Sequence, residues 1–211
     1  MNPVREIIEL ARHGEALKRV QRSGWLLAGV DCHRAESVAE HSYGSVVWSI
    51  IISRSLLEEG QIVDLGRVIT MAMIHDFPEA ITSDIPHSEE LTGDELIQAK
   101  MTTERRVFSR IAKIVPSFEK WMMDHWNDTE KRSSLESRIV ASSDLLDMLA
   151  HAIALEKSGV SPEVLDQFFR SSKKRLESFD ISIVNLICQE FYREHHEICD
   201  RLGIESVKTE H

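Results

Sequence analysis

This sequence contains few of the residues that interrupt helices, with nine glycines and five prolines among 211 residues. It also lacks stretches in which apolar and polar residues alternate, the pattern of a half-buried strand. No apolar run approaches the roughly 20 residues that a membrane-spanning helix needs, and the first residues lack the apolar segment of a signal peptide. We therefore expect an all-α protein located in the cytoplasm.

Cysteine and positive charge are also scarce. The three cysteines, Cys32, Cys188 and Cys199, are scattered and form no CxxC motif, so we interpret them as free thiols of a reducing compartment. The formal net charge is −10. Because phosphate backbones and anionic lipids attract basic surfaces, this charge argues against a nucleic acid or a membrane as the main partner. A small-molecule substrate remains compatible with it.

The hydrophobic content of 42% is sufficient for a sizeable core, and we expect residues 1–211 to form a single domain. An irregular segment is predicted from Arg22 to about residue 35. Capping patterns mark helix starts at Ser37 and Asp64, and Ser161-Pro162 marks another. The predicted helices cover residues 4–20, 37–59, 64–76, 92 or 94 to 115, a short aromatic segment from 117, 133–158, a segment from 161, and 181–202.

One carboxylate lies in an apolar helical run. Asp144 follows Ile139-Val140-Ala141-Ser142-Ser143, and a buried carboxylate is costly unless it is paired. The dipeptide His75-Asp76, which ends another apolar run, and His41, in the first turn of a helix, offer partners. Two histidines and two aspartates suit one borderline divalent ion such as Co, Mn, Ni, Fe or Zn. Glu79 follows His75 by four residues, so a helical path would place both on one face.

Several residues leave alternatives open. Asp147, one turn after Asp144, could supply the fourth ligand in its place. The segment from Trp121 to Trp126 could form core or a dimer interface. We predict that His195 and His196 lie at the surface, because adjacent helical residues point about 100° apart. The apolar face of the last helix could bury against a partner or against the chain's own core, and it comprises Ile183, Leu186, Ile187 and Phe191.

Five motifs occur in the order found in the HD-domain phosphohydrolases. They are Arg22-Ser23-Gly24-Trp25, Glu36-Ser37-Val38-Ala39-Glu40-His41-Ser42, His75-Asp76-Phe77-Pro78-Glu79-Ala80, Ser83-Asp84-Ile85-Pro86 and Ser143-Asp144. From about residue 15 to 160, the chain most resembles the small single-domain 5′-deoxynucleotidase branch of that family. The resemblance implies an HD-type helical bundle with a buried metal site between helices. It also implies a homodimer.

The resemblance also assigns roles to individual residues. His41, His75, Asp76 and Asp144 would hold a divalent metal ion, and Glu79 and Asp84 would take part in catalysis. Arg22 and Trp25 would contact the phosphate and the sugar. Ser23-Gly24 separates these two residues, whereas they are adjacent in some members of the family.

The expected reaction is hydrolysis of a 2′-deoxynucleoside 5′-monophosphate to deoxynucleoside and phosphate. Two alternatives remain at this point. One is another HD nucleotide phosphohydrolase, such as a dNTP triphosphohydrolase. The other is a nucleotide-sensing module without catalysis.

Overall fold

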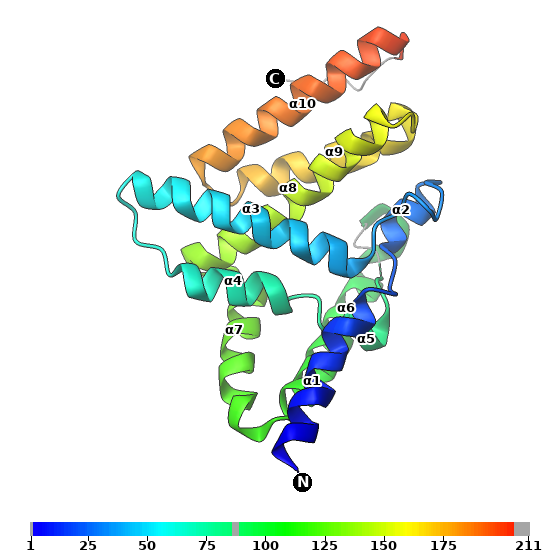
Figure 1. Cartoon of the computed structure of the whole chain (residues 1–211). Coiled ribbons are helices and arrows are strands. Elements are labelled where there is room, and N and C mark those ends of the chain that lie inside the picture. Colours follow the sequence, from blue (N-terminus) through cyan, green and yellow to red (C-terminus); the bar gives the residue numbers. More distant parts are fainter. Residues whose placement is uncertain (1, 86–88, 205–211) are drawn as a thin grey trace.

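The computed structural model describes residues 2–85 and 89–204, and helices are the regular structure in that part of the chain (Figure 1). The prediction of an all-α protein is confirmed. The α-helices are α1 Pro3–Leu17, α2 Ser23–Leu27, α3 Val38–Glu58, α4 Leu65–Ile74, α5 Glu79–Thr82, α6 Glu89–Ala112, α7 Glu119–Lys131, α8 Leu135–Lys157, α9 Pro162–Glu177 and α10 Ser182–Leu202, with a 3-10 helix η1 at Pro116–Phe118.

The predicted helix starts follow from local capping. The Ser37 side chain accepts a hydrogen bond from the Glu40 N–H while Glu40 binds back to the Ser37 N–H, which satisfies two N–H groups without helical partners. Asp64 caps α4 through the Arg67 N–H. Pro162 occupies the first turn of α9, where its missing N–H costs nothing.

Several boundaries differ from the prediction. The first helix ends at Leu17 rather than at residue 20, and α6 ends at Ala112 rather than at residue 115. Residues 23–27 form the short helix α2 inside the segment predicted to be irregular, because Ser23 is held by a distant aspartate described below. Helix α6 begins at Glu89 rather than at Thr92 or Asp94. The aromatic helix continues to Lys131, where Arg132 adopts a left-handed conformation and ends it.

Helices α3 and α8 lie at the centre of the molecule (Figure 1). Figure 1 shows α9 and α10 on one side of this pair and α4, α7, α6 and α1 on the other. The larger core includes Ile52, Met71, Leu146 and Leu149. Because the central helices are covered on both sides, polar groups that they carry inward must find partners inside the protein.

A smaller core joins α4, α6 and α7. The rings of Phe108 and Trp126 stack with centroids 4.9 Å apart, and Met122 is buried beside them. Trp121 is exposed. The aromatic segment therefore supplies core residues, as one of the two alternatives predicted.

The last helix buries most of its apolar face within the chain. Ile183, Ile187 and Phe191 pack against the larger core, and the Phe191 ring meets Trp48 edge to face at 5.7 Å. Leu186 remains 61% exposed. Of the two alternatives predicted for the apolar face of the last helix, burial against the chain's own core is therefore the one observed.

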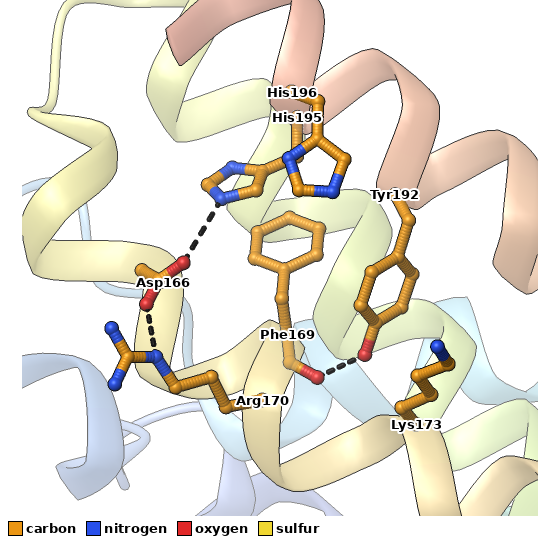
Figure 2. A pocket seen from close by; sticks show the side chains of 7 residues that line it. All are labelled: Asp166, Phe169, Arg170, Lys173, Tyr192, His195 and His196. Atoms are coloured by element: carbon orange, nitrogen blue, oxygen red, sulfur yellow. Dashed lines mark hydrogen bonds and ion pairs between the residues drawn. The ribbon is translucent and has the colours of Figure 1, made fainter. Parts of the chain in front are cut away.

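The prediction that His195 lies at the surface is wrong. Its side chain is 1% exposed, its Nδ1 lies 2.6 Å from Glu156 Oε1, and its ring stacks on Phe169 at 4.0 Å. Figure 2 shows the His195 ring above Phe169. His195 also lines a cavity of about 150 Å³. Because adjacent helical positions diverge, His195 can face the core while His196 lies at the rim.

Burial lowers the pKa of His195, but the carboxylates of Glu156 and Asp166 outweigh burial and raise it. The cavity beside it is lined by Asp166, Phe169, Arg170, Lys173, Tyr192, His195 and His196 (Figure 2). None of these belongs to the predicted active site.

Within residues 2–85 and 89–204, every helix is too short or too polar to cross a membrane. All three cysteines are free thiols.

Candidate metal centre

The four predicted metal ligands converge from three helices. His41 lies in the first turn of α3, Asp144 in the middle of α8, and His75-Asp76 at the end of α4. The Nε2 atom of His41 is 2.7 Å from Asp144 Oδ1 and 3.9 Å from Asp76 Oδ2. The Nε2 atom of His75 is 3.1 Å from the same Asp76 oxygen. Residues separated by 103 positions in the chain thus share one buried site.

The backbone of α4 orients His75. The helix ends at Ile74, and His75 Nδ1 lies 2.8 Å from the carbonyl oxygen of Ala72. A carbonyl oxygen can only accept, so Nδ1 carries the proton of the neutral ring. The Nε2 lone pair is then directed into the cluster, as a metal ligand requires.

Two buried atoms at the centre of the cluster have unfulfilled bonding capacity. His75 Nε2 and Asp76 Oδ2 make no hydrogen bond within the described part of the chain. Such unsatisfied buried atoms are uncommon and costly in folded proteins. Donor atoms of His41, His75 and Asp76 all lie within 4.8 Å of one another. A divalent ion fits this set, because it would bind directly the two atoms that make no hydrogen bond.

Negative charge dominates the electrostatics of this cluster. Burial lowers the pKa of His41, yet hydrogen bonds to Asp144 and Asp147 outweigh burial and raise that pKa to about 10. Burial would raise the pKa of Asp144, but His41 holds it well below its usual value. The site therefore attracts a cation. The Asp144 side chain retains 30% exposure, which leaves one side of the cluster open to a substrate.

Two backbone hydrogen bonds hold the segment that carries Arg22 against the start of α3. Its N–H donates to the Glu36 carbonyl at 2.9 Å, and the Val38 N–H donates to the Val20 carbonyl at 2.8 Å. Burial lowers the pKa of the Arg22 guanidinium, but Asp84 and the cluster carboxylates outweigh burial and raise it. The predicted phosphate-binding cation thus faces the predicted metal ligands.

Trp25 is only 1% exposed. Its ring packs against Phe168 at 4.2 Å and His151 at 5.1 Å, and its Nε1 donates to Glu36 Oε1 at 3.1 Å. The structure therefore gives Trp25 a packing role between α2, α8 and α9. Contact with a sugar would require the ring or its neighbours to move.

Glu79, the predicted catalytic carboxylate, is buried at the start of α5. Its Oε2 has no hydrogen-bond partner in the part of the chain that the structure describes, so this atom can accept a proton or bind a water molecule. Burial and the nearby carboxylates of Asp76 and Asp84 raise the pKa of Glu79 well above its usual value. A raised pKa brings a carboxyl group closer to the range useful for acid–base catalysis at neutral pH.

Asp84 lies in the loop after α5 and is held by α2. Its Oδ2 accepts a hydrogen bond from the Ser23 N–H at 2.7 Å. The predicted motif Ser83-Asp84-Ile85-Pro86 is described as far as Ile85, and Pro86 lies outside the described residues.

Lys100 was not predicted from the sequence as a residue of the site. This half-buried side chain on α6 donates to the Ile85 carbonyl oxygen, and its Nζ lies 3.8 Å from Glu79 Oε1 and 3.5 Å from Glu104 Oε1. A Lys-Glu pair four residues apart is common on exposed helices, so the spacing carries no signal of an active site. The position of Lys100 beside Glu79 becomes evident only from the packing of α6 against α5.

Asp147, the alternative fourth ligand, lies on the other side of the His41 ring. Its Oδ2 is 2.8 Å from His41 Nδ1, whereas Asp144 Oδ1 and Asp76 Oδ2 lie 2.7 Å and 3.9 Å from Nε2. Glu36 Oε1 is also near Nδ1, at 4.0 Å. The geometry thus separates the two aspartates by the ring atom that each one faces.

Comparisons with known proteins show what this chain is similar to. The model of the HD domain family matches residues 14–182. The chain is 28% identical to 5′-deoxynucleotidase HDDC2 of Homo sapiens over 169 residues, covering 80% of this chain and 77% of that protein. It is 27% identical to 5′-deoxynucleotidase YGK1 of Saccharomyces cerevisiae over 155 residues, covering 73% of this chain and 68% of that protein. The solved structure of PH0347 protein from Pyrococcus horikoshii OT3 superimposes with a TM-score of 0.70 at 31% identity, covering 86% of this chain and 98% of that one.

Proposed function

Because this chain belongs to the HD domain family, we propose that it hydrolyses 2′-deoxynucleoside 5′-monophosphates to deoxynucleoside and phosphate. The observation that carries the proposal is the cluster of two histidines and two aspartates, in which two buried atoms make no hydrogen bond within the described residues. The 5′-deoxynucleotidases similar to this chain support the choice of substrate.

In this proposal His41, His75, Asp76 and Asp144 hold one divalent ion. The ion would supply Lewis-acid activation of the phosphate and of the attacking water. The donor set of two imidazoles and two carboxylates suits Mn²⁺, Fe²⁺, Co²⁺, Ni²⁺ or Zn²⁺. Asp144, the most exposed of the carboxylates in the set, would face the incoming substrate.

The remaining residues bind the phosphate and transfer protons. Arg22 binds the phosphate through charge-assisted hydrogen bonds. Glu79 takes a proton from the attacking water through its unpartnered Oε2. Water oxygen bonds to phosphorus, the bond from phosphorus to the 5′-oxygen breaks, and the departing oxygen takes up a proton. Asp84 donates that proton or fixes the sugar, and general acid–base assistance of this kind is worth about 10²–10⁴ in rate.

The charges near the site favour a monophosphate over a triphosphate. Among the described residues, Arg22 and Lys100 are cations that lower the pKa of Glu79, and Lys100 already contacts Glu79 and Glu104. A triphosphate carries more negative charge and would need more cations. A dNTP triphosphohydrolase is therefore the second candidate, and a sensing module without catalysis is the third.

An assay of phosphate release tests the proposal. Purified protein is incubated with Co²⁺ or Mn²⁺ and a panel of deoxynucleoside mono-, di- and triphosphates with their ribose counterparts. We expect inorganic phosphate from the deoxymonophosphates at the highest kcat/KM. Release of triphosphate from dNTPs would identify the second candidate. Binding of nucleotides without turnover by any of the metals would identify the third.

We also propose that the protein is a cytoplasmic homodimer. The free thiols support a reducing compartment, and the exposed residues Tyr43, Val47 and Ile51 form an apolar stripe on α3 that a second copy could cover. Light scattering at micromolar concentration tests the dimer. A monomeric mass would contradict it.

A further inference from the structure

Gly44 and Asp147 make an unusually close contact between α3 and α8. A Cβ atom placed on Gly44 would lie 1.8 Å from Asp147 Oδ1 and 2.5 Å from its Cγ. No rotation of the added methyl group relieves this overlap, because Cβ is fixed by the backbone. The carboxylate of Asp147 therefore occupies the space that any other residue at position 44 would fill.

The conformation of Gly44 itself does not call for glycine. Its φ is not among the positive values of the described residues, and it lies inside a regular helix. A glycine in a helix interior costs about 1 kcal/mol relative to alanine. The close approach of Asp147 is thus the physical reason for a small residue at this position.

Asp147 uses this space to reach His41. Its Oδ2 lies 2.8 Å from His41 Nδ1, and the His41 ring is fully buried. His41 and Gly44 are one helical turn apart on α3, and Asp144 and Asp147 are one turn apart on α8. The two turns face each other, so His41 is held between one aspartate at each ring nitrogen.

We infer that Asp147 is a positioning residue for the metal centre and that Gly44 is the residue that admits it. A carboxylate that accepts a hydrogen bond from Nδ1–H fixes both the orientation and the tautomer of a histidine, and it leaves Nε2 free of a proton for a metal. This inference deepens the proposed function and rests on it. It assigns no direct contact between Asp147 and the ion.

The contrary interpretation is that Asp147, Glu36 and His41 Nδ1 bind the ion themselves, since these three also lie within 4.8 Å of one another. One oxygen of each carboxylate already has a hydrogen-bond partner, however. Glu36 Oε1 accepts the Trp25 indole N–H at 3.1 Å, and Asp147 Oδ2 pairs with His41. Two buried atoms that make no hydrogen bond within the described residues, His75 Nε2 and Asp76 Oδ2, lie instead on the Nε2 side of His41, where Asp76 Oδ2 is 3.9 Å from His41 Nε2.

Titration of the full chain with Co²⁺ by calorimetry and visible absorption tests the inference. The variants are Asp147→Ala, Asp147→Asn and Gly44→Ala. Gly14→Ala is the matched control, because Gly14 also lies within a helix and a Cβ there meets nothing within 4 Å. Circular dichroism establishes whether each variant folds. If Asp147→Ala and Gly44→Ala do not fold, Asp147→Asn still tests the inference, because it keeps the shape of the side chain.

We expect Asp147→Ala and Gly44→Ala to bind one Co²⁺ per chain about 10- to 100-fold more weakly than the wild type, the usual effect of removing a hydrogen-bond partner of a metal-bound histidine. Asp147→Asn, which retains an acceptor, should lose less, and its Co²⁺ absorption bands at saturation should match those of the wild type. Gly14→Ala should bind as the wild type does.

Two results would overturn this inference and leave the proposed function intact. One is wild-type Co²⁺ affinity in both Asp147→Ala and Gly44→Ala. The other is a change of the absorption bands in saturated Asp147→Asn, which would make Asp147 a ligand. Failure of the wild-type chain to bind Co²⁺ would instead overturn the metal centre of the proposed function, and this inference with it.

Discussion

The carboxylate of Asp84 accepts a hydrogen bond from the backbone N–H of Ser23 at 2.7 Å, although 61 residues separate the two in the chain. The Ser23 hydroxyl lies 3.0 Å from the same oxygen and 2.7 Å from the Asp84 carbonyl oxygen, so it can donate to either. This contact holds the loop after α5 against the start of α2, directly beside Arg22. Ser23, one of two residues that separate Arg22 from Trp25, thus links the two motifs.

Asp144→Ala should yield protein without a divalent ion. Asp144 is one of two carboxylates in the proposed ligand set, and its loss removes both a ligand and a charge. Metal analysis of the purified variant gives the answer, with Asp124→Ala on the exposed surface of α7 as the control. Full occupancy together with full activity would remove Asp144 from the metal centre.

Glu79→Gln should abolish turnover while leaving the metal bound, because the proposal places Glu79 outside the ligand set. The amide cannot take up a proton from water, although it keeps the shape of the side chain. Phosphate release and metal content are measured on the same preparation, with Glu58→Gln on an exposed turn of α3 as the control. Turnover at the wild-type rate would exclude Glu79 from catalysis, and loss of metal would make it a ligand.

Arg22→Ala should lower kcat/KM for dAMP by about 10- to 150-fold. That range corresponds to the 1.5–3 kcal/mol that a hydrogen bond to a charged group contributes. The position of Arg22 among the carboxylates of Asp84, Asp144 and Asp76 means that its removal also leaves negative charge uncompensated where the phosphate binds. An Arg22→Ala enzyme with wild-type kcat/KM would contradict the proposed contact.

Trp25→Ala should reduce the free energy of unfolding by about 3–5 kcal/mol, the usual cost of truncating a buried tryptophan. Urea unfolding measures this loss. If the ring also borders the sugar, the ratio of kcat/KM for dAMP over AMP should fall. Phe168→Ala, which removes the ring packed on Trp25, is the control for general loosening. An unchanged ratio in Trp25→Ala would leave Trp25 with its packing role only.

Lys100→Met should move the acid limb of the kcat/KM profile to higher pH. Glu79 must be ionised to accept a proton, so activity falls as the pH drops through its pKa. Lys100 opposes the rise of that pKa, and loss of its charge should therefore raise the pKa further. Lys120→Met on the exposed surface of α7 is the control. A limb that stays in place or moves to lower pH would contradict the role of Lys100.

The sequence by itself determined the helical class and several helix starts. Ser37, Asp64 and Pro162 act on backbone groups within one turn of themselves, so their effect can be inferred from neighbouring residues alone. The sequence also identified His41, His75, Asp76 and Asp144 as residues that should come together, and the structure places them together. Their binding of an ion stays a prediction.

Tertiary structure decided which side of each helix faces which partner. Asp144 and Asp147 are nearly equivalent in the sequence, and only the packing of α3 on α8 assigns them to opposite nitrogens of His41. The same kind of packing buried His195 and brought Lys100 to Glu79. Such contacts join residues far apart in the chain, and their geometry depends on how whole helices pack rather than on signals within a single turn.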